Sequence, residues 1–406
     1  MTDVGGLLRP LVPQVLGTLV RRHGQFDACE DAVQEALLAA SVQWQADGVP
    51  GDPRGWLITV ASRRLIDHFR SESARRRRED TVAALEPQAE DGPGEARPGD
   101  RDDTLSLLFL CCHPAVSAPS QVALTLRAVG GLTTAQIASA FLVPEATMAR
   151  RITRAKETIA AAGARFTEPS AADLPERLPV VLQVLYLIFN EGYTATSGAD
   201  LHRVELTAEA IRLTRAVHAL LPGTGEVAGL LALMLLTEAR REARTGPGGE
   251  LIPLQEQDRS RWDAALVDEG DALIDATLGR TELGPYQVQA AIAALHDRAP
   301  SAAATDWAQI VELYSVLRTM MPGPVVTVNQ AVALAQVAGP DRGLELLDTV
   351  DPKLDVGRRA DAVRAHLLEL KGDREAAREH YLRAAERTAS LPERQYLMTR
   401  AGRLGS

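Results

Sequence analysis

The sequence is poor in cysteine and contains no long apolar run, and each shortage excludes a class of protein. The 406 residues include three cysteines, Cys29, Cys111 and Cys112. Because two of them are adjacent, a disulfide framework is not expected, and a reducing cytoplasm fits best. The longest apolar runs, such as Gly229 to Leu236, are far too short to span a bilayer. The first residues show no basic lead followed by an apolar stretch, so no signal peptide is expected.

Signatures of catalysis are also missing. No GxSxG, HExxH, GxxxxGK or GxGxxG pattern stands where a strand would lead into a helix. The run Cys111, Cys112 and His113 suggests a metal-binding site at first sight. Adjacent cysteines on a helix point about 100° apart, however, and no fourth ligand is nearby in the sequence. Buried small side chains are the favoured interpretation of the cysteines. We therefore expect no metal, no cofactor and no enzyme activity.

The charge is unevenly placed along the chain. The net charge of -10 argues against nonspecific coating of nucleic acid by the whole molecule. Residues 1–168 carry 19 Lys and Arg against 21 Asp and Glu, whereas the remainder carries 25 against 33. Any DNA contact is therefore expected in the first part. Only three basic residues are lysines, Lys156, Lys353 and Lys371, which we attribute to a GC-rich genome more than to chemistry.

The segment from Pro53 to Arg70 predicts a helix with two different faces. The face that would pack on a core consists of Leu57, Ile58, Ala61, Leu65 and Phe69. The opposite face places an indole at the head of a row of guanidinium groups, and it consists of Trp56, Thr59, Arg63, Asp67 and Arg70. Aromatic rings interleaved with arginine suit unstacked bases. The alternative is that Trp56 caps the core and the arginines are merely solvated.

The preceding stretch, EDAVQEALLAASVQW, predicts a second helix. Its inward face consists of Val33, Leu37, Ala40 and Trp44. The side chains that point elsewhere form an acidic and amide surface with one leucine, and they are Asp31, Gln34, Glu35 and Leu38. This surface indicates a partner face, although a solvated helix side is equally compatible.

Low-complexity sequence follows the Trp56 helix. Four consecutive arginines, Arg75 to Arg78, precede an acidic stretch rich in Pro, Gly and Ala. Such a composition cannot bury a core, so we predict a flexible tether from Ser71 to Asp100. The arginine run is either solvated or a phosphate contact beside the DNA face.

Residues 103–165 follow the plan of a helix-turn-helix. A short helix begins at Thr133 or Thr134, a tight turn follows, and a long helix starts at Pro144, with Ala138 where the two helices approach closely. Met148, Ile152, Ala155 and Ile159 would face the core. The residues that could reach the DNA major groove or its phosphates are Glu145, Ala146, Thr147, Arg150, Arg151 and Arg154.

Together these segments resemble a bacterial sigma factor of the extracytoplasmic-function type. The matching blocks are DAVQEAL at Asp31 to Leu37, PRGWL with ASRRLIDHFR at Ala61 to Arg70, and the helix-turn-helix of Thr133 to Ala162. The resemblance implies that the first block, with Asp31, Gln34, Glu35 and Leu38, docks on the β′ clamp helices of core RNA polymerase.

The same resemblance assigns DNA contacts to the other two blocks. It implies that the second block recognises and opens the minus-ten promoter element through Trp56, Thr59, Arg63, Arg64, Asp67 and Arg70. Family members commonly carry Asn where this chain has Arg63, which leaves the bases read there open. The helix from Pro144 would read the minus-thirty-five element, while its domain packs on the β flap.

The remaining residues look helical throughout. Gly372, Ala377, Tyr381 and Ala384 stand at spacings seen in tetratricopeptide repeats, and the stretch from Val328 resembles a weaker preceding repeat. An apolar helix, Leu178 to Tyr193, ends in a segment for which we predict an interdomain or regulatory role, Phe189, Asn190, Glu191, Gly192 and Tyr193. Asn190 with Glu191 could mimic a catalytic pair, but a helix C-cap with a buried polar contact is favoured.

The sequence thus predicts an all-α protein of four parts. They are a sigma region 2 domain (1–78), a linker (79–102), a sigma region 4 domain (103–168) and a helical, tetratricopeptide-like regulatory domain (169–406). The resemblance implies core RNA polymerase and promoter DNA as partners, and the last domain suggests a regulatory protein or peptide as another. A one-component helix-turn-helix regulator with a helical sensor is the alternative, but it leaves the DAVQEAL and Trp56 blocks unexplained. An enzyme or scaffold centred on the C-terminal half is a third.

Overall fold

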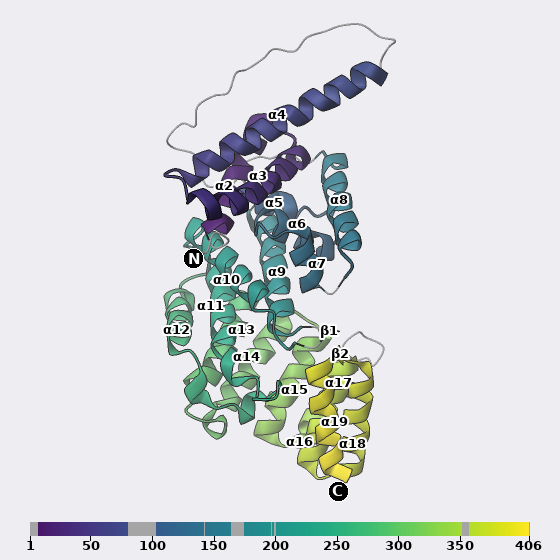
Figure 1. Ribbon diagram of the computed structural model, residues 1–406. Helices are drawn as coiled ribbons and strands as arrows, with labels where there is room; N and C mark the ends of the chain where they lie inside the picture. The colour runs from purple at the N-terminus through teal and green to yellow at the C-terminus, as the bar shows by residue number, and fades with distance from the viewer. Residues whose placement is uncertain are drawn as a thin grey trace. The chain divides into compact units, whose positions relative to one another are not determined.

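The computed structural model consists of helices almost throughout, which confirms the predicted all-α class (Figure 1). It describes residues 7–79, 103–141, 143–163, 174–195, 197–198, 200–350 and 357–405. The chain divides into two compact units, Met1–Val184 and Leu185–Ser406, called unit 1 and unit 2 below. No helix within the described ranges is both long and apolar enough to cross a membrane.

The first part of unit 1 packs three helices around an aliphatic core. They are α2 (Val12–His23), α3 (Phe26–Asp47) and α4 (Pro53–Glu79), preceded by the short η1 (Arg9–Leu11). The residues predicted to face inward from α3 are all buried, as are Leu57, Ile58, Ala61 and Leu65 of α4. Gly24 ends α2 with φ at 72°, a left-handed conformation that glycine adopts without strain.

Helix α4 begins where the sequence predicts but continues further. Asp52 caps its first turn, since its carboxylate accepts a hydrogen bond of 2.9 Å from the Gly55 amide. The helix runs through the four arginines to Glu79. The tether predicted to start at Ser71 is therefore wrong over its first nine residues, because arginine and glutamate are good helix formers that extend α4. The rest of the predicted tether lies outside the described residues.

The second part of unit 1 contains the predicted helix-turn-helix. Its helices are α5 (Thr104–Cys111), α6 (Ala118–Ala128), α7 (Thr134–Ala140) and α8 (Glu145–Ala161). Thr133 and Gln136 form a capping box at the start of α7, with hydrogen bonds of 3.2 and 2.9 Å. Ala138 is buried between the helices, and the four residues predicted to face inward from α8 are buried too.

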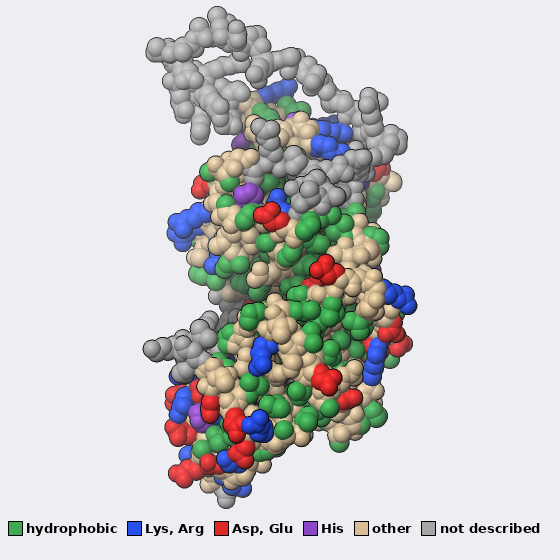
Figure 2. Space-filling view, turned by 180° about the vertical axis from the view of Figure 1, so that it is seen from behind, with side chains coloured by type: hydrophobic (Ala, Val, Ile, Leu, Met, Phe, Trp, Pro, Cys, Tyr) green, Lys and Arg blue, Asp and Glu red, His purple; other side chains and the backbone are tan. Residues whose placement is uncertain are grey.

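Unit 2 begins inside α9 (Leu174–Tyr193) and consists of helices that pack mainly on their neighbours in sequence. These are α10 (Val204–Leu220), α11 (Gly225–Ala239), α12 (Ala264–Thr277), α13 (Pro285–Arg298), α14 (Trp307–Met320), α15 (Pro324–Ala338), α16 (Pro340–Leu347), α17 (Gly357–Lys371), α18 (Arg374–Arg387) and α19 (Leu391–Gly405). Short 3-10 turns lie between them, η2 (Arg241–Ala243), η3 (Leu254–Glu256), η4 (Arg259–Arg261) and η5 (Ala302–Ala304). Charged side chains of both signs mix over the C-terminal helices (Figure 2).

Two strands join distant parts of unit 2. β1 (Ser197–Gly198) pairs in parallel with β2 (Ala389–Ser390), so that Ser197 lies opposite Ala389. The chain that follows α9 is thereby fixed to the segment that precedes α19.

The pair α17 and α18 contains the residues that suggested a tetratricopeptide repeat. Gly372 turns the chain between them with φ at 89°, and Ala377, Tyr381 and Ala384 are buried. The Tyr381 hydroxyl donates a hydrogen bond of 2.7 Å to Glu369 across the pair. In the pair α15 and α16, a Cβ on Gly343 would lie only 2.7 Å from the Ala331 carbonyl oxygen, so close helix approach requires glycine there. Whether these pairs are tetratricopeptide repeats stays a prediction.

Candidate functional site

The exposed face of α4 carries the residues predicted to meet separated DNA strands. Thr59, Arg63, Arg64, Asp67 and Arg70 are all exposed along the helix, while its other face is buried in the core. Three guanidinium groups are thus held on an exposed helix face, and that of Arg64 lies 3.5 Å from the Glu35 carboxylate of α3. Such a row can contact successive phosphates or stack on bases.

Trp56 lies at the boundary between these two faces. Its indole is half-buried and meets the buried indole of Trp44 edge-on, with ring centroids 5.4 Å apart and an interplanar angle of 65°. Aromatic pairs favour this geometry. Trp56 therefore packs on the core with one edge, as the alternative interpretation held, and keeps part of its ring available.

The predicted partner face on α3 is exposed at three of its four positions. Asp31, Glu35 and Leu38 are exposed, and 60% of Leu38 is accessible. Gln34 differs, because it is buried and its amide donates a hydrogen bond of 3.2 Å to the Arg127 carbonyl oxygen. The expectation that Gln34 points away from the protein is thus wrong for this conformation of unit 1.

The helix-turn-helix presents the N-terminal half of α8. Glu145, Ala146, Arg150 and Arg154 are exposed, and Thr147 and Arg151 are half-buried. The Arg150 Nε donates a hydrogen bond of 3.2 Å to the Ala146 carbonyl oxygen, which directs the side chain toward the start of the helix. All six residues lie on or beside one surface of a helix whose other side is held by the core.

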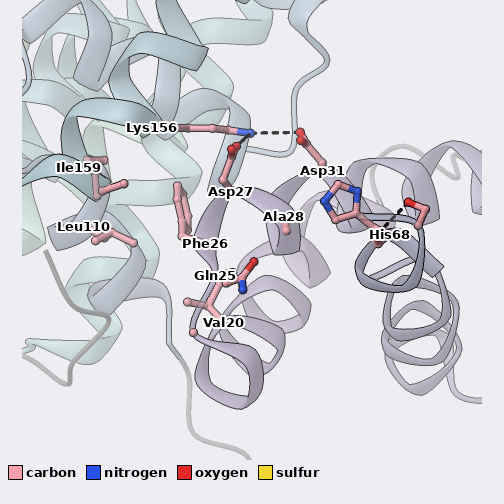
Figure 3. A pocket seen from close by; sticks show the side chains of 13 residues that line it. Val20, Gln25, Phe26, Asp27, Ala28, Asp31, His68, Leu110, Lys156 and Ile159 are labelled. Carbon is pink, nitrogen blue, oxygen red and sulfur yellow. Dashed lines mark hydrogen bonds and ion pairs between the residues drawn. The ribbon is translucent and has the colours of Figure 1, made fainter. Parts of the chain in front are cut away.

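A cluster of charges that sequence reasoning missed joins α3, α6 and α8. The Lys156 ammonium lies 2.7 Å from Asp27 and 3.1 Å from Asp31 (Figure 3), and it also lies 2.7 Å from Glu30. Arg127 also pairs with Glu30, at 2.8 Å. Burial lowers the pKa of Lys156, but the Glu30 carboxylate and the hydrogen bonds to Asp27 and Glu30 outweigh burial and raise that pKa above its ordinary value. The ammonium is therefore charged at neutral pH.

A cavity of about 650 Å³ adjoins this cluster. Phe26, Asp27 and Asp31 of α3 line one side, and Lys156 and Ile159 of α8 line another (Figure 3). The lining is therefore partly charged and partly apolar.

The segment Phe189 to Tyr193 forms a second cluster, within unit 2. Tyr193 stacks on Phe189 with centroids 5.8 Å apart, and the Arg244 guanidinium lies 4.1 Å from the Tyr193 ring centre. Burial, reinforced by Arg244, lowers the pKa of His202 to about 4, and this ring lies 2.9 Å from the Tyr193 carbonyl oxygen.

Polar contacts at the end of α9 resemble the C-cap expected there. The Thr194 amide donates to the Asn190 carbonyl oxygen at 2.8 Å, and Glu191 lies 3.5 Å from Arg203. A Cβ on Gly192 would lie 2.6 Å from the Thr207 nitrogen, so only glycine fits. The regulatory role predicted for this segment stays a prediction.

The Cys111 and Cys112 side chains are buried at the end of α5. Burial raises the pKa of Cys112 to about 12, so this thiol stays protonated. Within the described ranges, no three His, Cys, Asp or Glu side chains are grouped to hold a metal ion.

Comparison with known proteins relates three segments to protein families. Residues 7–75 match sigma-70 region 2 and residues 106–159 match sigma-70 region 4. Residues 177–278 match a family of unknown function, DUF6596. No solved structure shows a significant match.

Two kinds of relative are found among curated proteins. The chain is 40% identical over 98% of its length to uncharacterized protein R00370 of Rhizobium meliloti, of which it covers 95%. It is also 36% identical over 125 residues to the probable ECF RNA polymerase sigma factor SigI of Mycobacterium tuberculosis, in strains CDC 1551 / Oshkosh and H37Rv. This match spans 29% of the chain and 41% of SigI.

The match to sigma-70 region 2 includes most of α4, and the match to region 4 includes most of α8. These are the two helices whose exposed faces carry the predicted DNA contacts, and the segment that matches DUF6596 follows them. The chain belongs to the extracytoplasmic-function type of sigma factor, with a helical extension beyond region 4.

Proposed function

We propose that the chain is a dissociable specificity subunit of bacterial RNA polymerase that acts in the cytoplasm and performs no covalent chemistry. It joins the core enzyme, directs it to a promoter and assists strand opening. The observation that carries this proposal is the division of α4 into a buried apolar face and an exposed row of guanidinium groups headed by Trp56.

For the minus-ten element, Trp56 and the α4 arginines act on separated strands. The accessible part of the Trp56 ring stacks on an extruded base, while Arg63, Arg64 and Arg70 hold phosphates, and Thr59 and Asp67 supply polar contacts between them. Base stacking on an aromatic ring contributes roughly 1–3 kcal/mol per base, which offsets part of the unstacking cost. The packing of Trp56 on Trp44 supports this role, because it fixes the indole before DNA arrives.

For the minus-thirty-five element, the start of α8 enters the major groove. Glu145, Ala146 and Thr147 lie nearest the base edges, Arg150 is placed to read guanine, and Arg151 and Arg154 contact phosphates. The capping box at Thr133 supports this geometry, because it fixes the helix that precedes the turn.

For the polymerase, the α3 face is the docking surface. Asp31, Gln34, Glu35 and Leu38 meet the β′ clamp helices, and the domain of α5 to α8 packs on the β flap. The exposure of Leu38 supports a partner contact, because a leucine accessible over 60% of its surface gains free energy when covered.

The C-terminal unit modulates this activity. Its balance of 25 basic against 33 acidic residues beyond position 168 suits a protein or peptide partner better than DNA. Truncation after Glu168 should change promoter activity, and unchanged activity and solubility would contradict the modulating role.

In vitro transcription with purified core polymerase tests the proposal as a whole. The full chain should restore initiation from a subset of a promoter library. The one-component alternative requires sequence-specific binding of duplex promoter without polymerase, which a gel shift detects.

A further inference from the structure

Lys156 connects the helix-turn-helix to the helix proposed to dock on polymerase. It stands on α8, and its three carboxylate partners, at 2.7 to 3.1 Å, all stand on α3. Only 7% of the Lys156 side chain and 1% of the Glu30 side chain are exposed, whereas Asp27 and Asp31 are exposed over 69% and 63%. A buried ammonium on one helix is thus neutralised entirely by the other (Figure 3).

A second pair of contacts strengthens the same junction. The Arg127 guanidinium, on α6, lies 2.8 Å from Glu30, and the Arg127 carbonyl oxygen accepts the hydrogen bond from Gln34. Two of the four residues of the α3 face, Asp31 and Gln34, are therefore engaged by the helix-turn-helix domain. Glu35 and Leu38 remain exposed beside them.

The character of this junction favours opening. Its contacts are dominated by ionisable groups, and the two buried ones, Lys156 and Glu30, regain hydration when the helices separate. A pocket of about 650 Å³ that is open to solvent adjoins the cluster, so one side of the junction is not covered by packed side chains. A charged and hollow junction can hold two domains together and still release them to a competing partner.

We propose that Lys156 is a latch that holds unit 1 in a closed, polymerase-free state. In this state α6 and α8 bury Gln34 and hold Asp31 of the docking face in an ion pair, and the latch must release before the chain joins core polymerase. This inference rests on the proposed function, and its test separates the two.

The test measures closure and polymerase binding in the same full-length chain. Donor and acceptor dyes are attached to cysteines introduced at Gln45 on α3 and Ala161 on α8, both exposed. The three natural cysteines are buried and should not compete for the dyes. Energy transfer reports closure, and titration with purified core polymerase reports affinity.

Three variants isolate the latch. Lys156→Met with Glu30→Gln removes the two most deeply buried charges together, and the glutamine side-chain oxygen can still accept a hydrogen bond from Arg127, which loses its carboxylate partner. Lys156→Arg keeps the charge and should keep the chain closed. Lys371→Met in unit 2 breaks an exposed ion pair with Asp341 and is the control for loss of one lysine. Circular dichroism checks that each variant is folded.

The double variant should show lower energy transfer and should bind core polymerase several-fold more tightly than the wild type. Lys156→Arg and Lys371→Met should match the wild type in both measurements. Unchanged energy transfer in the folded double variant would overturn the latch. So would a loss of closure with no gain in affinity, because region 4 would then not obstruct docking. Failure of the wild type and of every variant to bind polymerase overturns the proposed function as well, whereas lower energy transfer together with tighter binding by the double variant supports both.

Discussion

The indole of Trp56 meets that of Trp44 edge-on, with centroids 5.4 Å apart, so the residue proposed to stack on DNA is anchored to the core of unit 1. Trp44 itself is 4% exposed and sits on α3, the helix that carries the proposed docking face. The proposed polymerase contact and the proposed role in strand opening thus belong to two helices that are joined by this aromatic contact.

Replacing Trp56 by alanine should impair both strand opening and stability. Loss of the edge contact costs about 0.5–1.5 kcal/mol of folding free energy beyond the loss of buried indole area. Loss of base stacking removes a further ~1–3 kcal/mol from the open complex. Trp56→Phe should recover much of both, because a ring remains. Permanganate footprinting of the promoter bubble, together with thermal unfolding, measures the two effects, and an unchanged bubble in the alanine variant would contradict the role.

The capping box at the start of α7 should contribute measurably to the free energy of unfolding of unit 1. Thr133→Ala removes the hydroxyl that accepts the Gln136 amide hydrogen bond of 3.2 Å. We expect a loss of about 1 kcal/mol in the unfolding of unit 1, and Thr133→Ser should restore most of it. Urea unfolding followed by circular dichroism provides the measurement, and equal stability of the alanine and serine variants would argue against the cap.

Arg150 and Arg154 should affect minus-thirty-five binding in different ways. Arg150→Ala removes a proposed base contact, so it should cost ~1–3 kcal/mol of DNA-binding free energy and relax specificity at one base position. Arg154→Ala removes a proposed phosphate contact, so it should weaken binding to all sequences alike. It should also lower the slope of the logarithm of the binding constant against the logarithm of the salt concentration by about 1. Binding of holoenzyme to a library of minus-thirty-five sequences at several salt concentrations separates the two. Arg318→Ala, at an exposed position of unit 2, is the matched control. Identical behaviour of Arg150→Ala and Arg154→Ala would refute the assignment.

The stability of unit 2 should fall as the pH drops below 6.5. Burial, with help from Arg240 and Arg259, lowers the pKa of His296 from 6.5 to about 3. Between these values the unfolded chain binds a proton that the folded state does not, so the free energy of unfolding decreases as the pH falls. The loss attributable to His296 is on the order of 4 kcal/mol between neutral pH and its folded pKa.

His296→Gln should flatten this dependence. Urea unfolding across the acid range is compared for the wild type, this variant and His68→Gln, whose side chain is exposed in unit 1. The readout is the slope of the free energy of unfolding against pH. The absolute stability is not used, because the His296 ring also packs on Trp307, with ring centroids 5.1 Å apart. Equal slopes in the wild type and His296→Gln would show that another group controls the acid response.

The faces of individual helices could be predicted from the sequence, because they depend on local periodicity. Leu57, Ala61 and Leu65 are buried as predicted, and of the two threonines predicted to begin the short helix, Thr133 is the one that caps α7. The end of α4 could not be predicted, because the arginine run is compatible with either a helix or a solvated tether.

Contacts between distant segments were also inaccessible to pattern reasoning. No local pattern marks Lys156 as a partner of α3, because 125 positions separate it from Asp31, although the two side chains meet. The burial of Gln34 follows from the same junction. The contact of Arg244 with Tyr193 similarly joins residues that no local periodicity connects.

Promoter-directed initiation by purified components tests the central claim most directly. The full-length chain is added to core polymerase and a promoter library, with Trp56→Ala combined with Arg63→Ala as the comparison. We expect the wild type to join the core enzyme and to give run-off transcripts from a subset of promoters, and the double variant to join equally well but to open no bubble. Failure of the wild type to join the core enzyme, or normal bubble formation by the double variant, would contradict this expectation.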